Sequence, residues 1–182
     1  MAIFRFMVFL LLAFFFFLVG TSILPMWIDV SNFYPHTSLL LAIAFIFPPE
    51  EKQNATDIQK VPLWSSLLLG GIMGYLEDLY FLAPKGLHSL VLLLIVSGLF
   101  YLRKYLLSPR GWFLVLLLGA MDVIYQMSIG LLSNWLIPKF YAVRTPMNFR
   151  LLFITLLASI PILWLVRKID RKLFLPRRGD EQ

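Results

Sequence analysis

The chain is organised around six long apolar stretches, separated by short segments that carry prolines, glycines and charged side chains. A helix of about 20 apolar residues crosses the hydrocarbon core of a bilayer. With 182 residues, 60% of them hydrophobic and 14% charged, the chain has more apolar surface than a soluble core of this size can bury. We therefore predict an all-α, polytopic integral membrane protein with a single transmembrane domain, residues 1–182. The six predicted transmembrane helices cover about 6–24, 31–47, 62–81, 87–102, 111–132 and 149–166.

Three of these stretches depart from a simple span. The first resembles a signal peptide, but its apolar run is long and residues 19–22 (VGTS) match a cleavage site poorly, so we expect an uncleaved helix. The second is short, opens with polar residues around His36 and ends at Pro48, so we expect it to be thin or partly buried in protein. The sixth contains Pro161, which predicts a kink.

Lys and Arg residues are unevenly distributed among the connecting segments. Cytoplasmic loops of membrane proteins carry an excess of these residues. If the N-terminus is cytoplasmic, 12 of the 16 Lys and Arg residues fall on the inner side and the remaining four on the outer side. This asymmetry predicts six crossings with both termini cytoplasmic. The basic tail, 167–182, is expected to lie on the inner surface and to contact anionic lipids.

Two adjacent acids, Glu77 and Asp78, lie within the third apolar stretch. Gly70, Gly74 and Asp78 are spaced four residues apart, which places them on one face of a helix. Small residues on such a face allow another helix to approach closely in lipid. We therefore expect the acids to point into protein, in the outer third of the bilayer. Glu77, offset from that face, is expected to be more exposed and to reach the headgroup region.

Two interpretations of Asp78 are open. A carboxylate near a helix C-terminus gains nothing from its own helix dipole and must find donors elsewhere. The free N–H groups of residues 86–88, at the start of the fourth helix, can supply them, which would make Asp78 a tertiary cap for the hairpin. Alternatively, Asp78 or Glu77 is a ligand or proton site. Its partner would then be His88, Arg150 or Lys85.

Asp122 lies about 16 Å along the fifth stretch, close to the middle of the bilayer. Gln126 follows one helical turn later, so a polar stripe crosses this helix. An ionisable residue at that depth indicates either a binding site or a structural hydrogen bond between helices. In the structural interpretation, the partner of Asp122 is the polar start of the second helix or Ser159.

The sequence offers little for catalysis or metal binding. It has no cysteine, which removes disulfides, thiol nucleophiles and thiolate metal ligands. It has two histidines, both interpreted as helix-start residues, and no HExxH, P-loop or GxGxxG motif. Its basic residues lie beside apolar runs and do not form a basic-aromatic groove. We therefore predict no catalytic residue, no cofactor, no metal and no nucleic-acid partner.

One segment resembles a known family. The sequence GYLEDLYFLAPKGLHSL, residues 74–90, is similar to the hallmark segment of the bacterial rod-shape-determining MreD family, in which a Gly-xxx-Asp helix is followed by a Pro and Gly turn. Chain length, hydrophobicity, six predicted spans and the basic tail agree with that family. Two residues, Glu77 and Lys85, depart from its pattern and bear on any partner contact at this turn. The matching positions are Gly74, Asp78, Pro84, Gly86 and Leu87.

The resemblance implies a non-enzymatic role in the bacterial cytoplasmic membrane. Members of the MreD family act with MreC, a single-span protein with a large outer domain, in the elongation machinery that supports peptidoglycan synthesis and cell shape. Their fold resembles the vitamin-binding S components of energy-coupling-factor transporters. We therefore expect a scaffold that binds an MreC-like partner and other elongation-complex membrane proteins, either as a monomer or as a homodimer.

The expected structural or partner-binding residues of this scaffold are Gly70, Gly74, Asp78, Pro84, Gly86, Asp122 and Gln126. The alternative function is a substrate-binding membrane component of a transporter for a small, vitamin-like solute. In that case Asp122 and Gln126 would line the solute pocket.

Overall fold

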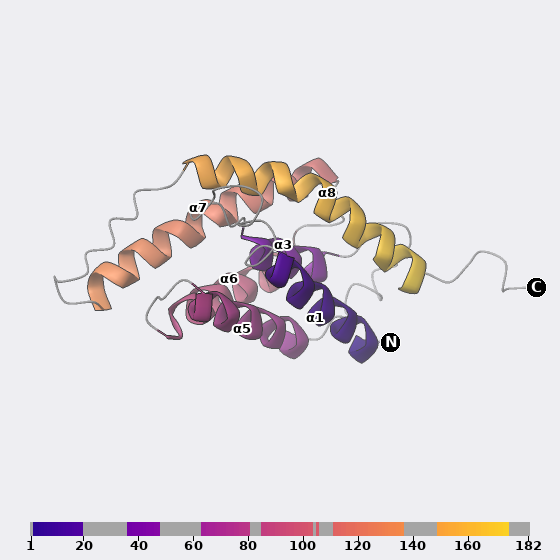
Figure 1. The fold of residues 1–182 in the computed structure, drawn as a ribbon, viewed down its shortest axis with the longest axis horizontal. Helices are drawn as coiled ribbons and strands as arrows, with labels where there is room; N and C mark the ends of the chain where they lie inside the picture. The colour runs from indigo at the N-terminus through magenta and orange to yellow at the C-terminus, as the bar shows by residue number, and fades with distance from the viewer. Residues whose placement is uncertain are drawn as a thin grey trace, which may run out of the picture.

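The computed structural model describes residues 2–19, 36–47, 63–80, 85–103, 105, 111–136 and 149–174. Within these ranges, the regular structure consists of six α-helices (Figure 1). They are α1 (Ala2–Leu18), α3 (Thr37–Ile46), α5 (Leu63–Tyr80), α6 (Leu87–Leu102), α7 (Gly111–Leu136) and α8 (Phe149–Phe174).

Each of the six predicted stretches overlaps one of these helices, so the all-α prediction is confirmed for the described residues. The fourth helix has the predicted bounds, 87–102, and the others differ at one or both ends, by up to eight residues at the C-terminus of α8. By length and composition, two of the described helices are suited to crossing a membrane, at Trp112–Trp135 in α7 and Leu151–Ile169 in α8. The lengths of the described helices therefore do not establish the six predicted membrane crossings.

Helix α3 lies at the centre of the structure. All ten of its residues are buried, and it contacts α1, α5, α6, α7 and α8. Ten helical residues extend only about 15 Å, half the thickness of the hydrocarbon core. The expectation that the second stretch is buried in protein is thus confirmed. As a helix, however, it is shorter than the predicted span 31–47, whose first five residues lie outside the described ranges.

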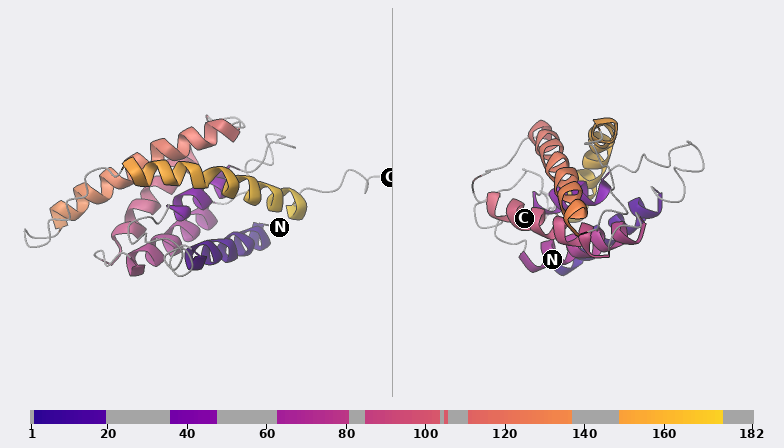
Figure 2. Two further views of the ribbon diagram at one scale, coloured as in Figure 1. Left: turned by 45° about the horizontal axis from the view of Figure 1, so that its top comes forward. Right: turned by 90° about the vertical axis from the view of Figure 1, so that its left-hand side faces the viewer.

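The helices form two groups around α3. Helices α7 and α8 lie together on one side, and α1, α5 and α6 lie on the other (Figures 1 and 2). The N-terminal end of α1 and the C-terminal end of α8 lie at the same end of the structure in both figures. Helices α5 and α6 pack along each other as a hairpin, and this pair makes the most extensive interface among the described helices.

The described helices other than α3 bury one face and leave an apolar face outside. On α7, for example, Leu114, Leu118 and Tyr125 are almost fully buried, whereas Leu116 and Trp135 on other faces are 61% and 89% exposed. A soluble protein rarely exposes large, contiguous apolar surfaces. The exposed leucine, phenylalanine and tryptophan side chains on α1, α5, α7 and α8 are therefore suited to contact with lipid or with another apolar surface.

Helix α8 is longer than predicted. It extends from Phe149 to Phe174 and so takes in the first eight residues of the predicted tail, 167–182. Lysine, arginine and leucine favour helix, and the next strong helix breaker is Pro176. Pro161 lies inside the helix, and the ribbon of α8 changes direction along its length (Figure 1).

Candidate functional site: a buried polar cluster

Polar side chains from four helices meet inside the bundle. They come from the start of α3, the end of α5, the start of α6 and the middle of α7. Seven of the eight residues are either buried polar groups or, for the tyrosine, part of the buried core, and Gln126 is partly buried. We call this group the buried polar cluster: His36, Ser38, Glu77, Asp78, His88, Asp122, Tyr125 and Gln126.

Asp78, near the C-terminal end of α5, caps the N-terminus of α6. Its Oδ2 accepts hydrogen bonds from the backbone N–H groups of Gly86, at 2.9 Å, and Ser89, at 3.2 Å. Its Oδ1 accepts one from the backbone N–H of His88, at 2.8 Å. The carboxylate therefore satisfies three N–H groups that a helix start leaves unpaired, and it faces the positive end of the α6 dipole. The tertiary-cap interpretation is confirmed, with Ser89 contributing where Leu87 was expected.

Two side chains of α6 add to this cap. The hydroxyl of Ser89 donates to Oδ2 of Asp78 at 3.0 Å. The Nδ1 atom of His88 lies 2.8 Å from Oδ1, so the imidazole donates when Nδ1 carries the proton. The pairing of Asp78 with His88, predicted as one alternative, therefore coexists with the cap. In both, the hydrogen-bond partners of the carboxylate come from the same chain.

The glycine face of α5 allows this cap to form. A Cβ atom on Gly74 would lie 2.4 Å from Cα of Ser89 and 2.7 Å from its backbone nitrogen, distances that real Cβ atoms do not adopt. A Cβ on Gly70 would lie 3.0 Å from a methyl group of Val96, further along α6. Because Gly74 brings the backbones together, Asp78, one turn later, reaches the first N–H groups of α6. The face that we expected another helix to fill is occupied by α6 of the same chain.

Gly86 has its own conformational role at the start of α6. It is the N-cap residue, and its φ of 95° lies in the left-handed region that residues with a Cβ rarely adopt. A Cβ at this position would meet no atom within 4 Å, so the constraint is the backbone angle and not the space. Glycine here turns the chain so that its N–H points at Asp78.

Glu77 is buried, which contradicts the expectation that it reaches the headgroup region. It is only 1% exposed. The hydroxyl of Ser38 on α3 donates to its Oε1, and the hydroxyl of Tyr125 on α7 donates to its Oε2. One residue along a helix is a rotation of about 100°, so Glu77 faces α3 and α7 while Asp78 faces α6. The two adjacent acids thus join α5 to three different helices.

Asp122 is fully buried on α7 and pairs with the polar start of α3. Its Oδ1 contacts Nδ1 of His36, the N-cap residue of α3, and its Oδ2 accepts a hydrogen bond from Nε2 of Gln126 at 3.0 Å. This confirms one of the two predicted partners. The other, Ser159, is buried on α8 and donates to the carbonyl of Leu156 at 2.6 Å.

Tyr125 lies at the centre of the cluster and connects its parts. Its ring packs edge-on against the His36 ring, with centroids 4.9 Å apart, and lies 6.1 Å from the His88 ring. Its hydroxyl bonds to Glu77. The side chain is fully buried, so the phenol supplies both apolar packing and the polar partner that a buried hydroxyl requires.

Sequence reasoning did not identify Ser38 or the burial of His36 as parts of this site, and it noted Tyr125 only as a neighbour of Gln126 in the polar stripe. The available signals were the polar residues that open the second stretch and the position of Tyr125 next to Gln126. Lys85, predicted as a partner of these acids, is exposed. Pro84 and the side chain of Arg150 lie outside the described residues.

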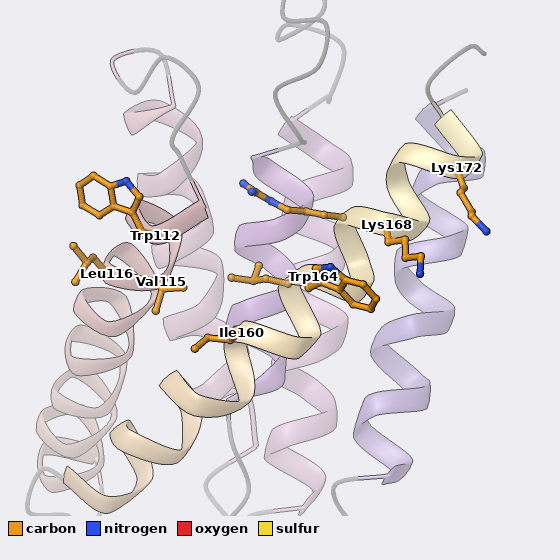
Figure 3. Close-up of a pocket in the computed structure, with 9 residues that line it drawn as sticks. Trp112, Val115, Leu116, Ile160, Trp164, Lys168 and Lys172 are labelled. Carbon is orange, nitrogen blue, oxygen red and sulfur yellow. The ribbon is translucent and has the colours of Figure 1, made fainter. Parts of the chain in front are cut away.

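The side chains of the buried polar cluster connect helices of the same chain through hydrogen bonds. Each of its three carboxyl groups has hydrogen-bond partners from the same chain, and removing one partner of a buried charged group costs about 3–5 kcal/mol. Satisfied polar networks favour one arrangement of the surrounding helices. Among the described residues, no group of three or more His, Asp and Glu side chains is arranged to hold a metal ion. A groove lies elsewhere, between α7 and α8 (Figure 3), and no member of the cluster lines it.

In its described residues, the chain is a helical bundle with two helices suited to crossing a membrane and an interior that contains buried, hydrogen-bonded acids. In comparisons with known proteins, no family model matches the chain, and neither a curated protein nor a solved structure matches it.

Proposed function

We propose that this protein is a non-enzymatic scaffold in the bacterial cytoplasmic membrane, similar to the MreD family. In this role it binds a single-span, MreC-like partner and supports peptidoglycan synthesis and cell shape. The observation that carries the proposal is the state of the buried acids. Glu77, Asp78 and Asp122 are bonded to groups of their own chain, so they act as structural links between helices.

The surface and the hallmark segment support this role. Large apolar side chains remain exposed on α1, α5, α7 and α8, which suits packing against lipid and against a partner's membrane helix. In the segment that resembles the MreD family, Gly74 allows the approach of α6, and Asp78 and Gly86 complete its cap. These positions therefore hold α5 and α6 together as a hairpin. Because α6 covers the glycine face, we place the partner on an outer face.

The proposed orientation has both termini in the cytoplasm. Two observations support it: the start of α1 and the end of α8 lie at the same end of the structure, and Arg103, just after α6, lies close to Arg5 on α1. Burial and the nearby charge of Arg5 lower the pKa of Arg103 to about 10, so the Arg103 guanidinium group is charged at neutral pH. Both arginines also belong to segments that the charge asymmetry assigns to the inner side.

Crosslinking in cells tests the scaffold proposal. A photoreactive residue is placed, one position at a time, at exposed sites such as Leu68, Leu94 and Phe153, and the source bacterium is irradiated. We expect crosslinks to a single-span protein with a large outer domain from one face only, and loss of rod shape when the chain is depleted. Normal cell shape and no such crosslink from any face would contradict the proposal.

The transporter alternative predicts a different result at Asp122. An Asp122→Asn variant retains a side chain of the same size but loses the charge that would bind a solute. If the variant still co-purifies with the single-span partner but uptake of a labelled nutrient collapses, the scaffold proposal is wrong. We expect no specific loss of uptake, and an effect on protein stability instead.

A further inference from the structure

A groove of ≈ 980 Å³ runs between the first turns of α7 and the C-terminal half of α8 (Figure 3). Its floor includes Leu163, which is only 6% exposed, and its walls are apolar. The side chains of Trp112 and Leu116 on α7 and of Ile160 and Trp164 on α8 are each about 60% exposed along it. The groove is therefore open and largely apolar, and it lies on the outer surface of the α7–α8 pair.

One end of this groove is basic. Arg167, Lys168 and Lys172 line it, and the described lining includes no acidic side chain. The ammonium group of Lys168 lies 4.5 Å from the ring centroid of Trp164, a cation–π contact that holds it over the apolar wall. Lys172, one turn further along α8, is exposed. The groove thus changes from apolar to positively charged in the direction of the helix C-terminus.

The length of the groove corresponds to one leaflet of a bilayer. From Ile160 to Lys172, α8 rises about 18 Å, compared with about 15 Å for half of the hydrocarbon core. The volume is in the range of a small-molecule site.

We propose that this groove binds an anionic phospholipid of the cytoplasmic leaflet, with its acyl chains between Trp112 and Trp164 and its phosphate at Lys168 and Lys172. The inference rests on the membrane location and orientation proposed above, which put this end of α8 on the cytoplasmic side. Tryptophan at the edge of the hydrocarbon core and basic residues beside it are the groups that recognise such a lipid. The charge of the site selects the anionic headgroup, because a neutral lipid would gain only the apolar contacts.

Fluorescence quenching by brominated lipids tests the proposal. The full chain is reconstituted into vesicles of phosphatidylcholine that contain either brominated phosphatidylglycerol or brominated phosphatidylcholine. Two variants each keep one tryptophan, Trp164 in the groove or Trp64 on the outer face of α5, with the others replaced by phenylalanine. We expect the anionic lipid to quench Trp164 about fivefold more effectively than the neutral lipid does, and Trp64 to show no such preference.

A matched pair of charge variants assigns the preference to the groove. Lys172→Gln removes a lining lysine, and Lys85→Gln removes an exposed lysine outside the groove. We expect only Lys172→Gln to remove most of the anionic preference at Trp164. Native mass spectrometry of the unmodified protein should show a retained phosphatidylglycerol, which Lys172→Gln loses. This measurement needs no tryptophan replacement, so it keeps the test valid if those variants fold poorly.

Three results would overturn the proposal. Equal quenching of Trp164 by both lipids would show that the groove does not select an anion. The same preference at Trp64 would show a general attraction of a basic protein to an anionic surface. Protection of Trp164 from both lipids, on dimerisation or on addition of the single-span partner, would identify the groove as a protein interface. Loss of partner binding with the lipid preference intact would contradict the scaffold proposal alone.

Discussion

Asp122, in the middle of α7, pairs with His36, which lies 86 residues earlier at the N-terminus of α3. The contact joins the most central of the described helices to α7, which is long and apolar enough to cross a membrane. A buried aspartate is costly unless it meets a matched partner. Its partner here is a buried imidazole, so the pair fixes how α3 lies against α7.

Replacing Gly74 by alanine should separate α5 from α6. The added methyl would meet the backbone of Ser89, which cannot move aside as a side chain can, so we expect a loss of about 3 kcal/mol in the free energy of unfolding. Gly71→Ala is the matched control, because its Cβ would lie 3.7 Å from a methyl of Leu93 and alanine is the better helix former. Unfolding of both variants in mixed micelles measures the difference, and equal stabilities would contradict the close packing at Gly74.

Asp78→Ala should destabilise the α5–α6 hairpin. It leaves the N–H groups of Gly86, His88 and Ser89 without their acceptor, and we expect a loss of about 3 kcal/mol and reduced abundance in the membrane. Asp78→Asn keeps one acceptor oxygen, so its free energy of unfolding should lie between those of Asp78→Ala and the native protein. If Asp78→Ala were normally abundant and stable but failed to bind the partner, Asp78 would belong to an interface instead.

Tyr125→Phe should weaken the link between α5 and α7. It removes the hydroxyl that donates to Glu77 and leaves that carboxylate with Ser38, so we expect a loss of about 2 kcal/mol. Tyr75→Phe, on the exposed face of α5, should change the free energy of unfolding by less than about 0.5 kcal/mol. Thermal unfolding followed by near-ultraviolet circular dichroism compares the two. A neutral Tyr125→Phe would show that Glu77 does not depend on this bond.

The stability of Gly86 variants should depend on how well the new residue tolerates a positive φ and not on the size of its side chain. Gly86→Ala places a Cβ on a residue with a φ of 95°, which costs about 1–2 kcal/mol even though the space around it is open. Asparagine tolerates this region better, so Gly86→Asn should be the milder change. Gly98→Ala, inside α6 and also in open space, should be neutral or stabilising. Thermal melting of the three variants gives the order, and an alanine at 86 as stable as glycine would contradict it.

The features that could be predicted from sequence are those that depend on local pattern. Apolar stretches located all six described helices, and the four-residue spacing of Gly70, Gly74 and Asp78 identified a close helix contact and a cap. The depth of Asp122 required a polar partner, and the start of the second stretch supplied one. In each case, a physical requirement of a single residue or helix limited the alternatives to a few.

The features that could not be predicted depend on how helices pack in three dimensions. Glu77 was wrongly expected near the headgroups. Its burial depends on contacts with α3 and α7, and the sequence of α5 does not specify where those helices lie. The short α3 was predicted as a span, since an apolar helix surrounded by five others and an apolar helix surrounded by lipid have the same composition. The groove between α7 and α8 likewise depends on how two distant segments diverge.

A double-mutant cycle on His36 and Asp122 tests most directly whether buried acids hold this bundle together. His36→Ala, Asp122→Ala and the double variant are unfolded in mixed micelles, and each free energy of unfolding is compared with that of the native protein. We expect each single change to cost about 3 kcal/mol and the double change to cost less than their sum by at least about 1 kcal/mol. Strictly additive losses, with no coupling between the two residues, would contradict the account.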